Sequence, residues 1–190
     1  MGAAGHDRFE AVMQKCVSLG REAAASGNYG LGAMVVREGA VLGESASGLV
    51  KGTDPTAHPE IVAIRTAAER VGSRYLPGAY LITTLEPCPM CTAAAIWAKM
   101  GGIVYGAAQP DALHWAAEHP DTTFTWRQIE MRARDVVRAG HPLIELYEGV
   151  CRDDCLALFP LTASRAREPR PHGRRAPAGG GRPAPVAGAR

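Results

Sequence analysis

Hydrophobic positions along this chain of 190 residues switch between helical spacing and strand-like runs. Near the start, the apolar positions recur at i, i+3, i+4 and i+7, which predicts a helix that ends at about residue 25. The positions that carry this spacing are Phe9, Val12, Met13, Cys16, Val17 and Gly20. Two β-rich runs follow, at 31–36 and 40–47, with Arg37-Glu38-Gly39 between them. We expect these runs to form a hairpin.

The rest of the apolar pattern alternates between strands and helices. Helices are expected to begin directly after His58 and Cys88. The other predicted elements are strands at 79–85, 102–106 and 142–147, and helices at 111–118, 125–139 and 153–159. This order predicts an α/β fold, a three-layer α/β/α sandwich with a five-stranded mixed sheet.

Two short segments combine residues that suit a metal ion. His58-Pro59-Glu60 contains an imidazole and a carboxyl group, and Cys88-Pro89-Met90-Cys91 contains two thiols. Zinc prefers imidazole nitrogen and thiolate sulfur, and a catalytic zinc site keeps a fourth position for water. We therefore predict zinc ligands at His58, Cys88 and Cys91. Glu60 is left to take a proton from the water and to pass it to a leaving nitrogen.

The prolines support this geometry, because proline is favoured at the first position of a helix. Pro59 and Pro89 place His58 and Cys88 at two helix N-termini, with Cys91 one turn into the second helix. Two other interpretations stay open: a structural zinc site and a redox-active C-x-x-C pair. A structural site requires a fourth protein ligand, and neither alternative gives Glu60 a role.

Composition narrows the class of protein. A hydrophobic content of 46% suits one compact domain, and no apolar run is long enough to span a bilayer. Five cysteines form an odd number, two of them assigned to metal, which favours a reducing, cytoplasmic setting over a disulfide scaffold. We expect one domain at 1–160, followed by a disordered tail at 161–190 that is rich in Arg, Pro, Gly and Ala.

The charge is unevenly distributed between these two parts. Of the 21 basic and 19 acidic residues, seven arginines and one acid lie at 161–190, which leaves 14 basic and 18 acidic residues and a net charge of −4 in the first 160. An acidic domain disfavours a nucleic-acid partner, although the basic tail keeps that partner as an alternative.

The two metal segments carry a family resemblance. H-x-E followed by P-C-x-x-C is the signature of zinc nucleobase deaminases. Residues 54–61 and 85–91 resemble the cytidine deaminase superfamily, in particular its purine-acting branch of guanine deaminases and tRNA adenosine deaminases. The resemblance covers roughly 8–159. It implies a bound Zn²⁺, Glu60 as the catalytic proton carrier and a homodimer.

The resemblance also implies residues that contact the substrate. Leu31 matches a position that is often Phe and packs on the base, and Ser47 matches an Asn that hydrogen-bonds the base. We expect the backbone around Ala57 and Cys88 to orient the ring. Trp97 matches an aromatic residue in the guanine deaminase pocket, and Asp121 matches a carboxylate that reads the substrate's amino edge.

The sequence therefore predicts a hydrolytic deaminase of a small nucleobase or nucleoside, with a guanine-type purine favoured. In this reaction a zinc-held hydroxide attacks the carbon that bears the amino group, while Glu60 moves the proton. Serine in place of the usual asparagine at position 47 keeps other substrates open. The alternatives are a tRNA adenosine deaminase, a cytosine- or aminotriazine-type deaminase, and a non-enzymatic structural zinc protein or degenerate deaminase subunit.

Overall fold

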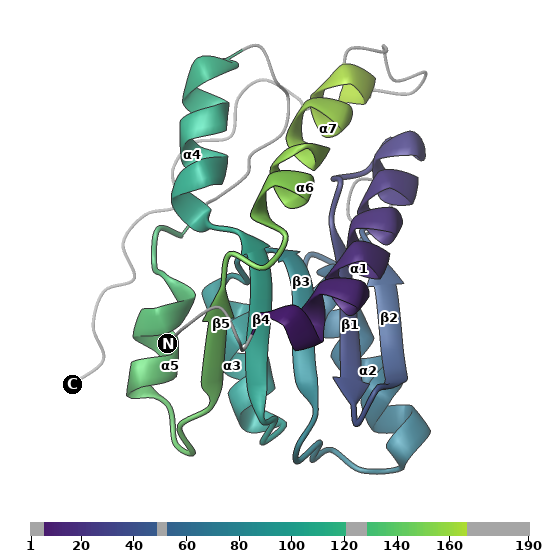
Figure 1. Cartoon of the computed structure of the whole chain (residues 1–190), viewed down its shortest axis with the longest axis vertical. Helices are drawn as coiled ribbons and strands as arrows, with labels where there is room; N and C mark the ends of the chain where they lie inside the picture. The colour runs from purple at the N-terminus through teal and green to yellow at the C-terminus, as the bar shows by residue number, and fades with distance from the viewer. Residues whose placement is uncertain (1–5, 49–52, 121–128, 167–190) are drawn as a thin grey trace, which may run out of the picture.

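Five strands form one mixed sheet at the centre of the molecule (Figure 1). The computed structural model describes residues 6–48, 53–120 and 129–166. The strands lie in the order β2-β1-β3-β4-β5, with β1 antiparallel to both of its neighbours and β3, β4 and β5 parallel to one another. Their bounds are Gly32–Arg37 (β1), Ala40–Ala46 (β2), Tyr80–Leu85 (β3), Gly102–Ala107 (β4) and Glu145–Glu148 (β5).

The described residues form seven helices, distributed over both faces of the sheet. Their bounds are Asp7–Ala25 (α1), Pro59–Val71 (α2), Pro89–Trp97 (α3), Gln109–Glu118 (α4), Ala133–Ala139 (α5), Arg152–Leu156 (α6) and Leu158–Ala166 (α7). One core cluster joins the sheet to α1, α4, α6 and α7, and a second joins it to α2, α3 and α5. The predicted three-layer α/β/α sandwich with a five-stranded mixed sheet is confirmed.

Local chemistry explains where several elements begin and end. The β1–β2 turn uses Glu38 and Gly39, both at positive φ, which is the backbone that a tight two-residue hairpin requires. Helix α2 ends at Gly72, which adopts the left-handed conformation and closes the helix with its own N–H. The predicted hairpin is present, with its strands displaced by at most one residue.

Three predicted boundaries differ from the structure. The last strand begins at Glu145 and not at Pro142, since proline has no N–H to donate to a sheet. Residues 125–128 of the predicted fifth helix lie outside the described residues, and the helix itself begins only at Ala133, after an extended Arg132. The expected single helix at 153–159 is two helices, α6 and α7.

The folded part also continues past Pro160, where the sequence pattern predicted a disordered tail. Pro160 is the third residue of α7, and in the first turn of a helix the missing N–H of proline costs nothing. Thr162 is fully buried, and its hydroxyl accepts a hydrogen bond from the Gly30 N–H at 2.7 Å. The rest of the predicted tail, from 167 to 190, lies outside the described residues.

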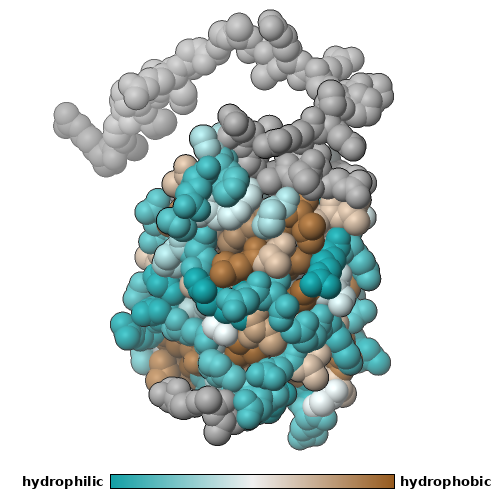
Figure 2. All heavy atoms as spheres, turned by 45° about the horizontal axis from the view of Figure 1, so that its top comes forward, coloured by the Kyte–Doolittle hydropathy of each residue, from teal (hydrophilic) through white to brown (hydrophobic). Residues whose placement is uncertain are grey.

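Figure 2 shows one face of the molecule, on which apolar residues gather near the centre inside a largely hydrophilic rim. Among the helices that the structure describes, none is both long enough and apolar enough to cross a bilayer.

Candidate metal centre

The candidate centre lies at the edge of the sheet where β2 and β3 end. Helices α2 and α3 both begin close to this edge, and His58 and Cys88 are their N-cap residues. Pro59 and Pro89 occupy the first helical positions, as the sequence predicted. Ligands at the carboxyl ends of strands follow the general rule for open α/β sheets.

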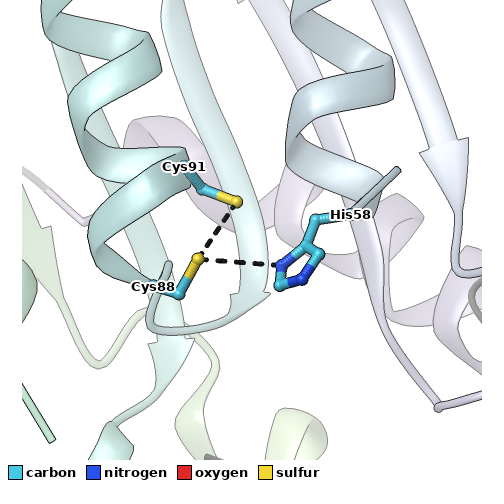
Figure 3. A group of neighbouring side chains, drawn as sticks. All are labelled: His58, Cys88 and Cys91. Carbon is cyan, nitrogen blue, oxygen red and sulfur yellow. Dashed lines mark hydrogen bonds between the residues drawn. The ribbon is translucent and has the colours of Figure 1, made fainter. Parts of the chain in front are cut away.

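Three side chains converge at this edge (Figure 3). The Cys88 Sγ lies 3.7 Å from the His58 Nδ1 and 3.5 Å from the Cys91 Sγ. One ligand atom from each of the three residues lies within 4.8 Å of the other two. The structure therefore brings together the three predicted metal ligands.

These distances fit a tetrahedral zinc ion. With Zn–S bonds of about 2.3 Å, two sulfurs bound to one tetrahedral ion lie about 3.7 Å apart. Two thiols and one imidazole form a donor set that zinc prefers, and they leave one position for a non-protein ligand. The half-buried His58 and Cys88 and the fully buried Cys91 are thus positioned to bind zinc.

The two cysteines of this centre shift each other's pKa in opposite directions. The hydrogen bond between the Cys88 Sγ and the Cys91 Sγ lowers the pKa of Cys88, and the hydrogen bond with His58 acts in the same direction. The same bond to Cys88, together with burial and the charge of Glu60, raises the pKa of Cys91. A bound cation lowers the pKa of Cys91 instead, because a thiol that coordinates a metal loses its proton.

Glu60 lies directly beside the three ligands. Its side chain is 4% exposed, and its Oε1 accepts a hydrogen bond from the Thr83 hydroxyl at 2.8 Å. Its Oε2 lies 3.5 Å from the Cys91 Sγ. One carboxylate oxygen is thus held by β3 while the other faces the metal ligands, which suits a group that carries protons beside a metal.

The predicted substrate residues are only partly assembled. Ser47 follows the end of β2, and its N–H donates to the Leu31 carbonyl at 2.9 Å, so both residues lie at the metal edge of the sheet. Ser47 is 3% exposed, and its Oγ has no hydrogen-bond partner among the described residues. Ala57 directly precedes His58 and is half-buried.

The structure does not place the other two predicted substrate residues, Trp97 and Asp121, at the metal edge. Trp97 is 82% exposed and lies at the opposite end of α3 from Cys88, about 14 Å along the helix axis for nine residues at 1.5 Å each. It lines a separate cavity with Tyr75 and Ile96, away from the metal ligands of its own chain. Asp121 lies outside the described residues.

Sequence reasoning missed the residues that support the ligands. Thr83 holds Glu60, and the Thr92 hydroxyl donates to the Cys88 carbonyl at 3.0 Å. Glu86 accepts hydrogen bonds from Arg132 and from two backbone N–H groups. The only sequence signal for these roles was their place beside the motif, because their partners are distant along the chain.

Comparison with known proteins places these features in a family. The model of the cytidine and deoxycytidylate deaminase zinc-binding region matches residues 7–107. The chain is 35% identical to guanine deaminase of Bacillus subtilis over 127 residues, which are 66% of this chain and 80% of that protein. It is 40% identical to the tRNA-specific adenosine deaminase of Agrobacterium fabrum over 98 residues, which are 52% of this chain and 64% of that protein.

A solved structure shows the same fold. It is a mutant of the protein NE0047 in complex with 8-azaguanine, and it matches with a TM-score of 0.70 and 25% sequence identity. The match covers 82% of this chain and 85% of that chain.

Proposed function

We propose that this chain, which belongs to the cytidine and deoxycytidylate deaminase family, is a zinc-dependent hydrolase. Its reaction removes the amino group from a small nucleobase or nucleoside. Water is consumed, the carbon that carried the amino group becomes a carbonyl, and ammonia is released. The observation that carries this proposal is the convergence of His58, Cys88 and Cys91 beside a buried Glu60.

The residues of the chain divide the chemistry between them. His58, Cys88 and Cys91 would hold the zinc ion, which acts as a Lewis acid and lowers the pKa of water towards neutrality. The Glu60 carboxylate takes a proton from water and then donates it to the amino nitrogen as that nitrogen leaves. The Thr83 hydroxyl keeps this carboxylate oriented through the 2.8 Å bond.

A guanine-type purine is the substrate that we favour. The Bacillus subtilis relative, of which this chain covers 80%, is a guanine deaminase, and the NE0047 mutant binds 8-azaguanine. The Ser47 Oγ is buried at the metal edge and has no partner within the described part of the chain, so it offers a hydrogen bond to a polar base. A serine hydroxyl offers fewer hydrogen bonds than the asparagine amide that the resemblance to the purine-acting branch leads us to expect at this position. We therefore expect a site that also accepts purines other than guanine.

A tRNA adenosine deaminase is the second candidate. The 40% identity with the Agrobacterium enzyme exceeds the identity with the guanine deaminase, although it extends over fewer residues. The net charge of −4 in the first 160 residues opposes binding to RNA, and this is why the small substrate is favoured.

An ammonia-release assay discriminates between these candidates. Zinc-loaded protein is incubated with guanine, 2,6-diaminopurine, adenine, cytosine, their nucleosides, an aminotriazine and an adenosine-containing anticodon stem-loop RNA. We expect the fastest turnover with a free aminopurine. Turnover of the RNA alone would replace this proposal with the second candidate, and no turnover of any of these compounds would contradict the enzyme assignment.

We also propose a cytoplasmic homodimer. Five free cysteines, three of them buried, suit a reducing compartment. The exposed Trp97 stands beside a cavity of about 400 Å³ whose walls include Ala93, Ile96 and Val136, and a second copy would cover this face. Sedimentation velocity of the wild type and of Trp97→Glu tests the assembly, with a dimer and a monomer as the expected states.

A further inference from the structure

The carboxylate of Glu86 is almost fully buried, two residues before the metal ligand Cys88. Its side chain is 1% exposed, and among the described residues it accepts hydrogen bonds from Ala133, Gln109 and Arg132. Oε1 accepts from the Ala133 N–H at 2.8 Å, and Oε2 accepts from the Gln109 N–H at 2.7 Å. The Arg132 Nε lies between both oxygens, at 2.8 and 2.9 Å. A buried charge is tolerated only when it is paired and hydrogen-bonded in this way.

The donors come from two helices on opposite faces of the sheet. Gln109 is the first residue of α4 and Ala133 is the first residue of α5, so both N–H groups belong to helix starts, where they have no partner within the helix. Helix α4 packs in the core cluster of α1, whereas α5 packs in the cluster of α2 and α3. Glu86 thus joins both helical layers at one point of the sheet edge.

The backbone between Glu86 and Cys88 is fixed on its other side as well. The Glu86 N–H donates to the Ala107 carbonyl at 2.8 Å, which ties it to β4. The buried Thr92 hydroxyl donates to the Pro87 and Cys88 carbonyls at 3.3 and 3.0 Å. The side chain of Glu86 and the hydrogen bonds of Thr92 thus hold the same short segment that carries the Cys88 thiol.

We propose that Glu86, held by Arg132, is a positioning residue that fixes the Cys88 thiol in the geometry that zinc binding requires. This inference rests on the zinc site of the proposed function. Groups that orient metal ligands from outside the coordination shell typically change metal affinity 10- to 100-fold when they are replaced. Glutamine at position 86 would retain the shape of the side chain but lose its charge. Its NH₂ group would face hydrogen-bond donors of Gln109, Ala133 or Arg132, to which it cannot bond.

Asp111, in the first turn of α4, provides a matched control for Glu86. Its Oδ2 accepts from the Ala108 N–H at 2.8 Å, next to the start of α4, and its carboxylate pairs with Arg152 at 2.6 Å. Like Glu86, it combines a backbone N–H near a helix start with a guanidinium. Its hydrogen-bond partners, however, do not include the segment that carries Cys88 and Cys91.

The test measures metal binding directly and does not depend on turnover. Zinc affinity is determined by competition with a chromogenic chelator for wild type, Glu86→Gln and Asp111→Asn, together with the visible absorption bands of Co²⁺-substituted protein. We expect Glu86→Gln to bind zinc 10- to 100-fold more weakly and to shift the Co²⁺ bands, while Asp111→Asn stays within about threefold of the wild type with an unchanged spectrum.

Two further outcomes have defined meanings. Unchanged zinc affinity and Co²⁺ bands in Glu86→Gln would overturn the positioning role, and a wild type that binds no zinc would instead contradict the proposed function. Arg132→Gln serves if Glu86→Gln does not fold, since it keeps the carboxylate and both helix donors. A smaller change in the same direction would support the inference, and none would overturn it.

Discussion

Glu60 shows how one side chain can be reserved for proton transfer beside a metal. One of its oxygens is occupied by Thr83 and the other lies 3.5 Å from the Cys91 Sγ, so its carboxylate is next to the ligands. A carboxylate this close to the ligands competes with them for the metal. The three converging donors are nitrogen and sulfur, which zinc prefers over the oxygens of Glu60. The carboxylate is thereby left available for the substrate.

Replacing Glu60 with glutamine separates chemistry from metal binding. We expect Glu60→Gln to lower kcat by about 10²–10⁴-fold, because the amide preserves the shape of the side chain but cannot carry a proton. Zinc content, measured by atomic emission, is expected to equal that of the wild type. Glu44→Gln, an exposed glutamate on β2, is the control and should retain full activity. Loss of zinc from Glu60→Gln would instead identify Glu60 as a ligand.

The metal ligands could be predicted from the sequence, whereas the location of Trp97 in the fold could not. His58, Cys88 and Cys91 lie within two short segments, so proline placement and helical spacing sufficed to orient them. Trp97 also lies on α3, but its position relative to the metal depends on the length and direction of the helix, which a residue match does not contain. Glu86 and Arg132 are 46 residues apart, and only the folded chain brings them together.

At the scale of elements, the metal edge depends on how closely α2 approaches β2. Gly43 of β2 lies against the backbone of α2, where an added Cβ would collide with the Ala63 carbonyl and would stand 2.8 Å from the Ala67 nitrogen. Ala63 and Ala67 are themselves fully buried. Small residues on both elements thus set the position of the helix that carries His58 and Glu60.

A methyl group at this contact should move the helix. We expect Gly43→Ala to destabilise the fold by about 1–3 kcal/mol and to weaken zinc binding, because backbone atoms have to shift to admit the Cβ. Denaturant unfolding and chelator competition measure the two effects. Gly48→Ala is the matched control, since its Cβ would meet no atom of the described residues within 4 Å and its φ is not positive. Equal stability of the two variants would contradict the proposed contact.

The order and type of the elements were predicted better than their ends. Apolar runs on either side of turn residues predicted the β1–β2 hairpin. Helical spacing predicted both ligand helices, because each of them buries one regular face. The start of α5 was missed because Arg132 is drawn out of the helix by its bonds to Glu86, a contact between distant segments. Thr162 was assigned to a tail because its burial depends on Gly30, 132 residues earlier.

At the scale of the whole molecule, two buried thiols make the stability of the fold depend on pH in the alkaline range. Cys16 of α1 and Cys155 of α6 are at most 1% exposed and belong to the same core cluster. Burial, assisted by the charge of Cys151, raises the pKa of Cys155 to about 12, and burial also raises the pKa of Cys16. An unfolded cysteine has a pKa of about 8.5. Between these values the unfolded chain loses protons that the folded chain retains.

The sign of this effect follows from the raised pKa values. The contribution is fully present below about pH 8.5, and stability falls as the pH rises towards 12, by about 1.4 kcal/mol per pH unit for each buried thiol. We expect Cys155→Ala to reduce this slope between pH 9 and pH 11 by about that amount, as measured by urea unfolding at several pH values. Burial also raises the pKa of Tyr105, and this contribution is common to the wild type and to Cys155→Ala. The raised pKa of Cys16 depends in part on the charge of Cys155, so its contribution to the slope falls as well in this variant. Cys151→Ala, which removes a more exposed thiol from the neighbouring turn, should change the slope less, and an equal change in both variants would show that burial is not the cause.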